Sequence, residues 1–554
     1  MITPPTVPGH RGQEPARAWA HSTDRIHVVV IDRVRALMTE RAGLWKGATL
    51  DLLFAVYLLA IGILRLSVIS SFPEPSGLDG GNWLAFGNAL FGAHFRSASV
   101  VYPPLIPLIT IAFAKVWGPL RGIEILAAVV SLAPAAGIYL PLRRHLGVRA
   151  VLLAGLLAPA ATTGEAAAWG GYPQLLGLGL LGAVLWALDR FTHTHSLKWA
   201  GAASVLIFLT LLTSDLIGVA TVVIAIVFVI IRLVMFSDSE RPSGKRLAVA
   251  VLIGAAPSIT LTPIYAALAA GVLGNQVNKG AYQLTFSTLL PTLDNLLKDN
   301  VDLWHLLLVV ALLSPIALVF RRARPVNQEA AATLATTIAM LFALRDDRLF
   351  FLLPIGVVLG AGSWWMLLTD PRRPLMWWTT MPHLRPPLFL TFDNVLVTTA
   401  AAILVLQSAL GISTFQSQVG FYSTLTPGIV SGLEMLDRVA PHEATLAVGP
   451  APRNGWPFGW WVEGLLNRPT VYASNLRWLN FPDERRRASL ANEMFSARVG
   501  IDGAIVLAKT NGISYIVVAS EWPGYRVWLS NGRPLATSMV LVSNESILII
   551  STSG

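Results

Sequence analysis

Long apolar runs between residues 47 and 413 constrain this chain more than any other feature. A helix needs ~20 predominantly apolar residues to cross a bilayer, and eleven runs come close to that length or exceed it. The composition agrees, because 54% of the 554 residues are hydrophobic and only 13% are charged, against about 25% in soluble proteins. We therefore predict a polytopic α-helical membrane protein. A soluble enzyme, a disordered scaffold and a nucleic-acid-binding domain are excluded as descriptions of the whole chain.

One further apolar run, 100–118, decides the topology. It opens on Tyr102-Pro103-Pro104 and also contains Pro107. If it lies in the membrane interface, one set of alternate loops holds 15 Lys and Arg, against seven in the opposite loops between residues 71 and 388. The positive-inside rule then predicts eleven spans, with the N-terminus cytoplasmic and the C-terminus outside. The expected spans are 47–70, 121–142, 148–164, 172–190, 197–213, 215–236, 247–272, 303–320, 329–345, 348–368 and 389–413.

The remaining sequence divides into three further regions. Residues 1–46 are a basic tail, expected to be cytoplasmic, and 71–120 form a large outer loop with juxtamembrane helices inside the membrane module 47–413. Residues 414–554 are less apolar and are expected to form a small extracytoplasmic α/β domain. Its predicted strands are 445–448, 515–519, 539–542 and 547–550, with a helix-like stretch over 483–507.

Charge and cysteine content narrow the function classes. The net charge of +10 is mainly an orientation signal from the inward loops, so no nucleic-acid partner is expected. Cysteine is absent, which excludes disulfides, thiolate metal sites and cysteine nucleophiles. Arginine exceeds lysine, and Ala and Gly are abundant, a composition typical of high-GC, actinobacteria-like genomes. The expected location is a bacterial plasma membrane.

Asp79 is the main candidate for chemistry. It follows a turn in the first outer loop, ahead of a short amphipathic stretch. A carboxylate near the bilayer surface is well placed to deprotonate a hydroxyl acceptor as a general base. The alternative is that Asp79 caps a helix, because aspartate is common at N-caps.

Several segments in this order resemble the GT-C superfamily of integral-membrane glycosyltransferases, which use polyprenyl-phosphate-linked sugars. The superfamily includes protein mannosyltransferases, aminoarabinose transferases and oligosaccharyltransferases. Besides the first-loop acid and the proline-led helix after it, the matching segments are Leu140–Gly147, Trp169–Pro173 and Asp346–Pro354. The resemblance covers most of the chain at the level of the superfamily. It implies that Asp79 is a catalytic base or a metal-side acid.

A second acid, Glu165, stands in the loop where GT-C enzymes often carry one. The resemblance implies contacts to a metal or an acceptor, and oxygen ligands suit Mg²⁺ or Mn²⁺ between Asp79 and Glu165. No Asp-x-Asp pair is present, and Glu165 alone also reads as a solvated loop acid. Nearby, Trp169 and Tyr172 read equally as interfacial anchors or as platforms on which a sugar stacks.

Three arginines are candidates for the phosphate of the lipid donor. Arg345 and Arg348 lie on the outer side, against the topological trend, and arginine binds phosphate in a bidentate manner. The alternative is mutual pairing with Asp346 and Asp347. Arg65 lies inside a span, where it either neighbours the same phosphate or reaches the outer headgroups.

The last candidates would contact the acceptor. Asp215 follows Ser214 where GT-C relatives often have Thr-His, and His94 lies in the first outer loop. In the outer domain, Trp460, Trp461 and Glu463 lie in a segment similar to the Trp-Trp-Asp-Tyr-Gly motif of oligosaccharyltransferases. The Asp and Tyr of that motif are replaced, so the segment either binds acceptor or packs the domain on the membrane.

The sequence thus predicts transfer of a sugar from a polyprenyl-phosphate donor to an extracytoplasmic glycan, lipid or protein, with inversion and with Asp79 as base. The alternative is a non-catalytic transporter or envelope-assembly protein on a related scaffold. Transporters usually carry repeated halves and ionisable residues at mid-membrane. This sequence shows no repeat, and its unusual polar residues gather at outer helix ends.

Overall fold

The computed structural model describes residues 47–75, 77, 79–92, 102–235, 241–260, 291, 303–314, 324–344, 347–368, 385–452, 458–474, 476 and 482–553. Contacts divide the chain into two parts, Met1–Val56 and Tyr57–Gly554. Of the first part, residues 47–56 are described, and they begin the helix Gly47–Ile69.

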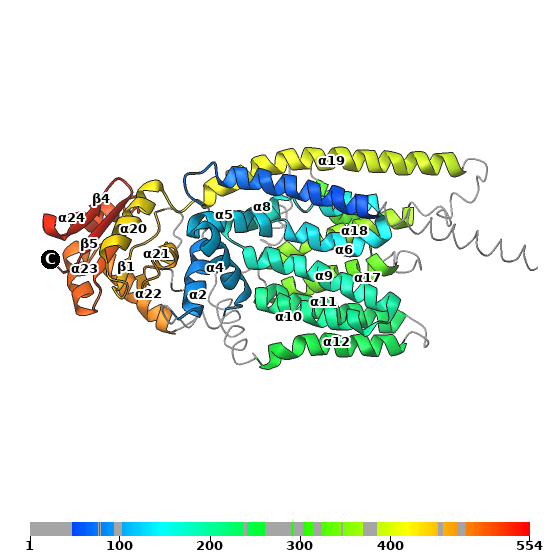
Figure 1. The fold of residues 1–554 in the computed structure, drawn as a ribbon, viewed down its shortest axis with the longest axis horizontal. Coiled ribbons are helices and arrows are strands. Elements are labelled where there is room, and N and C mark those ends of the chain that lie inside the picture. The colour runs from blue at the N-terminus through cyan, green and yellow to red at the C-terminus, as the bar shows by residue number, and fades with distance from the viewer. Residues whose placement is uncertain are drawn as a thin grey trace, which may run out of the picture. The chain divides into compact units, whose positions relative to one another are not determined.

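Helices make up most of the described structure (Figure 1). Up to residue 422 they are α2 Gly80–Leu90, α4 Leu105–Trp117, α5 Pro119–Val130, α6 Ala133–Leu146, α7 Val148–Gly155, α8 Ala161–Trp169, α9 Tyr172–Thr194, α10 Leu197–Thr213, α11 Asp215–Met235, α12 Arg241–Thr260, α15 Leu303–Leu312, α17 Arg324–Leu344, η1 Asp347–Leu352, α18 Leu353–Leu368 and α19 Arg385–Tyr422. Pairs such as α6 with α9 and α9 with α10 pack along their lengths.

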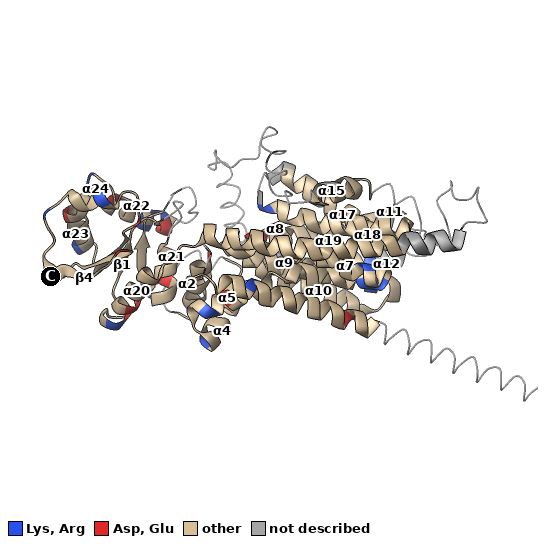
Figure 2. Ribbon diagram, turned by 90° about the horizontal axis from the view of Figure 1, so that it is seen from above, with Lys and Arg blue, Asp and Glu red and all other residues tan. Residues whose placement is uncertain are grey.

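Six helices among the described residues are long and apolar enough to cross a membrane. They are Gly47–Ile69, Pro119–Leu146, Tyr172–Thr194, Asp215–Arg232, Arg348–Leu368 and Asn394–Tyr422. Each overlaps a span expected from the sequence. Figure 2 shows few charged residues along the middle of the helices and more of them near the helix ends and in the sheet-containing region. The chain is therefore a membrane protein with several apolar helices.

The apolar run 100–118 contains α4, a helix of 13 residues that ends at Gly118. At 1.5 Å per residue it is about 20 Å long, shorter than the ~30 Å hydrocarbon core. Gly118 has φ +83° and Pro119 starts α5, which packs back against α4. The short α4 agrees with the expectation that this run does not cross the membrane.

The expected span 148–164 is wrong as a single helix. The chain forms α7 and α8 instead, separated at residues 156–160. Pro159 lacks a backbone donor and disfavours a continuous helix. The hydroxyl of Thr163 lies 2.8 Å from the carbonyl oxygens of both Leu157 and Ala160, so its single hydrogen can be donated to one of the carbonyls that the break frees. The helix expected at 389–413 is longer than predicted, since α19 runs to Tyr422 and crosses the predicted domain boundary at 414.

After α19 the chain forms five strands and several helices. The strands are β1 Leu446–Val448, β2 Thr470–Tyr472, β3 Tyr515–Ala519, β4 Val540–Ser543 and β5 Ile547–Ser551, and the helices are α20 Pro427–Val439, α21 Gly459–Leu466, α22 Pro482–Met494, α23 Gly500–Thr510, α24 Tyr525–Ser530 and η5 Thr537–Met539. The five strands form one sheet in the order β2-β1-β3-β5-β4. The first three strands are parallel, and β5 and β4 add in antiparallel fashion.

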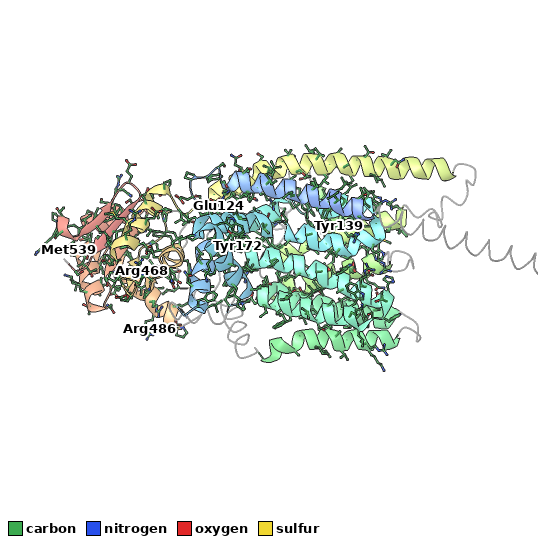
Figure 3. All side chains as sticks on the ribbon, viewed as in Figure 1. Glu124, Tyr139, Tyr172, Arg468, Arg486 and Met539 are labelled. Atoms are coloured by element: carbon green, nitrogen blue, oxygen red, sulfur yellow. The ribbon has the colours of Figure 1, made fainter. Side chains whose placement is uncertain are left out.

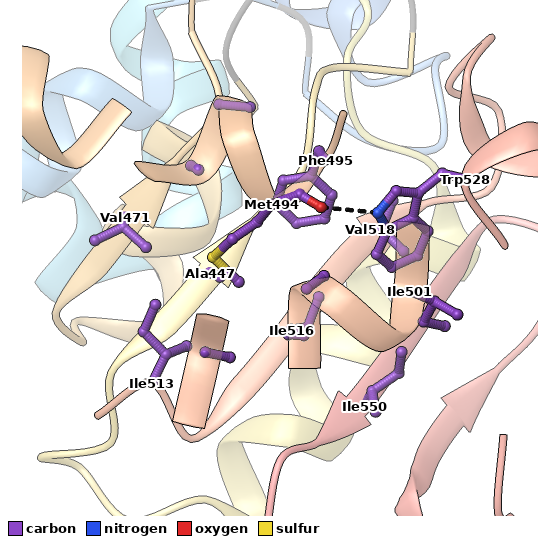
Figure 4. Close-up of a cluster of buried hydrophobic side chains, with 14 of the residues drawn as sticks. Ala447, Val471, Met494, Phe495, Ile501, Ile513, Ile516, Val518, Trp528 and Ile550 are labelled. Atoms are coloured by element: carbon purple, nitrogen blue, oxygen red, sulfur yellow. Dashed lines mark hydrogen bonds between the residues drawn. The ribbon is translucent and has the colours of Figure 1, made fainter. Parts of the chain in front are cut away.

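The sheet packs on a core drawn from α22, α23, α24 and the strands (Figure 4). Within it, the indole of Trp528 donates to the carbonyl of Met494 at 2.9 Å. All four predicted strands are confirmed within one or two residues. The strand β2 was not predicted, because three residues are too few to show a period. The predicted stretch 483–507 is two helices, since Gly500 takes φ +62° and starts a new one.

Candidate functional site

Asp79 stands at the N-cap of α2, but its side chain does not cap the helix. Its carboxylate Oδ1 accepts instead from the side-chain amide of Asn82 at 2.9 Å. The backbone N–H of Asp79 donates to the carbonyl of Trp169 at 3.1 Å, which ties the start of α2 to the end of α8. The capping explanation of Asp79 is thus not supported, and the carboxylate is available for another role.

The loop of Asp79 packs against the Trp169–Pro173 segment. Gly170 has φ +97°, and a Cβ there would lie 3.0 Å from the Cβ of Asp79. The indole of Trp83 donates to the carbonyl of Gly170 at 2.8 Å. Glycine suits a left-handed backbone position so close to another segment of the chain. The glycine in this motif therefore positions Asp79, a role that the sequence did not reveal.

Burial raises the pKa of the Asp79 carboxyl to about 7, against the smaller opposing effects of Arg348 and the Asn82 hydrogen bond. Desolvation disfavours the charged carboxylate, whereas a nearby cation and a donated hydrogen bond favour it. A base with a pKa near the working pH combines adequate deprotonation with adequate basicity. The predicted role of Asp79 as a general base is consistent with this pKa.

Arg348 and Asp215 reach the same neighbourhood from distant parts of the chain. Tyr102, just ahead of α4, has its pKa raised well above the usual value, first by burial and then by Asp215, while Arg348 acts in the opposite direction and Asp79 adds to the increase. The tyrosine ring lies 5.0 Å from that of Trp83, centroid to centroid. Asp79, Tyr102, Asp215 and Arg348 thus interact electrostatically in one place.

Tyr102 is the residue that sequence reasoning missed as part of the site. The sequence drew attention to it only as the start of a proline-led helix. Its high pKa keeps the phenol protonated, so it is a hydrogen-bond donor at neutral pH. The available signal in the sequence was its position directly before Pro103-Pro104, just ahead of the start of α4.

Glu165 has a different neighbourhood. It lies in α8, and its carboxylate accepts from the hydroxyl of Tyr422 in α19 at 3.0 Å. Tyr172 is fully buried at the start of α9 (Figure 3), so it is not an anchor at the membrane surface. Trp169 is partly buried and its ring lies against Gly171, where a Cβ would come within 2.6 Å of it. A cation between Asp79 and Glu165 stays a prediction.

Arg65 is buried, with 1% of its surface exposed. Its guanidinium donates to the carbonyl of Ser131 and to the hydroxyl of Thr163, both at 3.2 Å, and lies 5.2 Å above the ring of Phe415. These contacts join the first helix to α8 and α19. These buried contacts with the protein are typical of a structural cross-link, and the predicted role of Arg65 in binding the donor phosphate stays a prediction.

The two tryptophans of α21 pack directly on the loop of Asp79. Trp461 is fully buried in α21, and its indole donates to the carbonyl of Gly77 at 2.9 Å. A Cβ on Gly80 would lie 2.7 Å from the Trp461 ring. Trp460 packs edge-on against Phe86 of α2, with ring centroids 5.0 Å apart. The packing alternative for this segment is therefore supported.

Of the four remaining candidates, the structure describes Glu463 and Asp215. Glu463 is buried in α21. Asp215 starts α11, where its carboxylate accepts from the N–H of Leu216 at 2.7 Å, and the hydroxyl of Ser214 accepts from Ile217 N–H at 3.4 Å. The Ser-Asp pair thus also serves the helix start. His94 and Arg345 lie outside the described residues.

Comparison with known proteins bears on the fold. No protein-family model matches the chain, and no curated protein matches it. Among solved structures, ArnT from Cupriavidus metallidurans bound to undecaprenyl phosphate superimposes with a TM-score of 0.56 over 91% of this chain and 98% of that one, at 14% identity. The chain has the GT-C fold. The resemblance inferred from the sequence is thereby confirmed at the level of the fold.

A second GT-C structure is similar over a smaller share of its own length. The oligosaccharyltransferase AglB from Archaeoglobus fulgidus, in complex with an inhibitory peptide and a dolichol-phosphate, gives a TM-score of 0.51 at 13% identity. The match covers 88% of this chain and 72% of AglB. ArnT in the apo state gives 0.52 at 15% identity, over 91% of this chain and 97% of ArnT.

Proposed function

We propose that this GT-C-fold protein is a glycosyltransferase that moves a sugar from a polyprenyl phosphate to a hydroxyl of an extracytoplasmic acceptor, with inversion. The observation that carries the proposal is the electrostatic interaction between Asp79 and Arg348, which both also act on Tyr102. A carboxyl with a pKa of about 7 and a guanidinium, 269 positions apart in sequence, influence one another in one site. This reaction needs a base for the acceptor hydroxyl and a cation for the phosphate of the donor.

The reaction follows from these two residues. Asp79 accepts the proton of the acceptor hydroxyl as its oxygen attacks the anomeric carbon from the face opposite the phosphate. The bond between that carbon and the phosphate oxygen breaks, and the lipid phosphate leaves with one additional negative charge. Arg348 stabilises that charge, because a fixed cation in a water-poor site acts strongly where charge develops. Tyr102, protonated at neutral pH, donates a hydrogen bond to the same phosphate.

The structural relatives support a lipid-linked donor. ArnT was solved with undecaprenyl phosphate and AglB with a dolichol-phosphate. A donor of this kind suits an outer-face site, because nucleotide sugars stay in the cytoplasm. The proposal places the first outer loop and the domain after α19 outside the cell and the N-terminus inside. The acceptor is an envelope glycan, a glycolipid or a protein.

Arg345, Glu165, His94 and Asp215 belong to the proposal as secondary groups. Arg345 would bind the donor phosphate beside Arg348, and the other three would contact acceptor or, for Glu165, Mg²⁺ or Mn²⁺. Arg65, Trp460, Trp461 and Glu463 are proposed instead to maintain the structure around the site. Their burial and protein contacts support this assignment.

Gene deletion followed by complementation tests the function. Wild type should restore the profile of envelope glycans and glycolipids, and Asp79→Asn should not, although it reaches the membrane in equal amount. Asn82→Ala is the control, since it changes a neighbour of the carboxylate but keeps the base. Full restoration by Asp79→Asn would contradict the base assignment and favour a transporter or an assembly protein on the same fold.

A further inference from the structure

A second group of titratable side chains lies at the opposite end of α9 from Asp79. His145 is in the last turn of α6, and Asp189 and His193 are one turn apart near the end of α9. Each offers one ligand atom, and the three atoms lie within 4.8 Å of one another. Over the residues that the structure describes, no other His, Cys, Asp and Glu side chains form such a group. The proposed glycosyltransferase site does not use them.

The distances in this group fit a tetrahedral zinc site. His145 Nε2 lies 3.4 Å from Asp189 Oδ2, and His193 Nε2 lies 3.1 Å from Asp189 Oδ1. Zinc binds imidazole nitrogen and carboxylate oxygen at about 2.0–2.2 Å, so neighbouring ligand atoms in a tetrahedron are about 3.3–3.5 Å apart. The two histidines approach different oxygens of Asp189, and one ligand atom from each of the three residues lies within 4.8 Å of the others. Small side-chain shifts would bring these atoms to the spacing of a tetrahedral zinc site.

The ligand types and their exposure also suit a metal. Two imidazoles and one carboxylate form a typical three-ligand zinc set, with a fourth position open to water. The Asp189 side chain is 3% exposed, whereas those of His145 and His193 are 13% and 35% exposed. The carboxylate is thus held at the base of the group, and a metal can enter from the histidine side.

The surrounding charges favour a cation. α6 and α9 both end here, and the C-terminus of a helix attracts positive charge. Glu329 of α17 is buried near Asp189, and desolvation favours the neutral form of such a carboxyl, so it adds no negative charge. The negative charge of the group is that of Asp189, and Arg144 offsets part of it, since its guanidinium lies 3.6 Å from Asp189 Oδ2.

Close packing holds the two helix ends together. Gly137 of α6 lies against Gly179 and Gly182 of α9, at positions where an added Cβ would meet the facing backbone. Such contacts allow the two backbones to touch and fix their relative position. His145 is two turns beyond Gly137, and His193 is three turns beyond Gly182. The ligands are therefore arranged before any metal binds.

We propose that His145, Asp189 and His193 bind zinc, with water in the fourth position, and that the ion joins the ends of α6 and α9. The site does not depend on the proposed glycosyltransferase function. With the topology expected from the sequence, it faces the cytoplasm.

Zinc binding by the full-length protein tests the site directly. The chain is purified in detergent with an affinity tag that contains no histidine, stripped with chelator and titrated with ZnCl₂ in a calorimeter. We expect one equivalent per chain by elemental analysis after dialysis. In the double variant His145→Gln/His193→Gln, we expect the Kd to rise about 100-fold or more, because loss of even an outer partner of a metal ligand costs about 10- to 100-fold.

Glutamine retains hydrogen bonding to Asp189 but is a poor zinc ligand, so the double variant should fold. The matched control is His195→Asn, which removes an exposed neighbouring histidine outside the group. It should bind like the wild type. Cobalt in place of zinc should give the visible bands of tetrahedral Co²⁺ in wild type and in this control only. Absence of zinc from the wild type, or equal binding by the double variant, would show a hydrogen-bonded triad and overturn the proposal.

Discussion

Two aspartates mark the two ends of α9, and their surroundings differ. The backbone of Asp79 contacts the segment before α9, and its carboxylate accepts a hydrogen bond from the neutral amide of Asn82. Asp189, near the other end, has Arg144, His145 and His193 within 3.6 Å. Asp189 lies 17 residues beyond the start of α9 at Tyr172, which corresponds to about 25 Å along the helix. At Asp79, the nearby groups offset the desolvation of the carboxylate only in part. Asp189 has closer contacts, with an arginine and two histidines.

The comparison teaches that burial alone does not assign a role to a carboxylate. Where the protein leaves desolvation largely uncompensated, the carboxyl keeps a proton near pH 7 and can exchange it. Where an arginine and two imidazoles surround the carboxylate, as at Asp189, it serves as a ligand or a hydrogen-bond partner. The same residue type therefore suits chemistry at one end of α9 and cohesion at the other.

Exchanging each aspartate for asparagine should separate the two roles. Asp79→Asn should lower kcat/KM for sugar transfer by about 10²- to 10⁴-fold, because a general base contributes that much. Its melting temperature should stay the same or rise, since a desolvated carboxyl is lost. Asp189→Asn should lower the free energy of unfolding by about 2 kcal/mol, because it breaks charge-assisted hydrogen bonds. An equal loss of activity in both variants would break the comparison.

The arginine beside each carboxylate offers a matched pair. Arg348→Ala should reduce kcat/KM by about 10²- to 10³-fold, since it removes a group that stabilises developing charge. Arg348→Lys should recover part of this. Arg144→Ala should leave transfer within a few-fold of wild type. Steady-state transfer with a synthetic polyprenyl-phosphate sugar measures all three, and a large loss in Arg144→Ala would contradict the separation of the two ends.

Gly170→Ala tests whether the seat of Asp79 matters for activity. The added Cβ would lie 3.0 Å from that of Asp79, and displacement of a reacting group by about 1 Å can cost about 10²-fold in rate. We expect kcat/KM to fall by about 10- to 100-fold.

Gly118→Ala is the control for backbone strain. Gly118 also has positive φ, +83°, but nothing lies within 4 Å of an added Cβ. This variant should lose stability without a comparable loss of kcat/KM. Equal kinetic losses in Gly118→Ala and Gly170→Ala would mean that the effect arises from general strain and not from contact with Asp79.

The pH dependence of transfer should show the smallest effect. A base must be deprotonated, and the folded pKa of Asp79 is raised to about 7. The value of kcat/KM should therefore rise about tenfold per unit below pH 7 and level off above it. Asn82→Ala removes a hydrogen bond that lowers this pKa, so the midpoint should move to higher pH while activity at pH 9 changes little. A midpoint near pH 4 would exclude Asp79 as the titrating base.

Much of the architecture was predictable because it depends on local composition. Apolar runs located the helices Gly47–Ile69, Pro119–Leu146 and Tyr172–Thr194, and short strand-like runs located four of the five strands. The break at 156–160 was missed because apolarity persists through it and hides Pro159.

The site divides in a similar way. Asp79 was singled out from the sequence as a lone acid between the first two predicted spans, and Arg348 as a cation in a weakly basic loop, and the roles of both stay proposals. The role of Gly170 was not, because it depends on which backbone lies opposite. The sequence singled out Trp460 and Trp461 but left open whether they bind acceptor or pack, and only their contacts with Gly77 and Phe86 support packing.

The sequence by itself determined that the chain enters a membrane, where its helices lie and which polar residues are unusual there. These properties follow from the cost of placing polar groups in hydrocarbon, which acts on each segment separately. Only the tertiary structure decided that Asp79, Tyr102, Asp215 and Arg348 interact, and that His145 meets Asp189 and His193. A pKa or a ligand set depends on distances between side chains, and packing sets those distances.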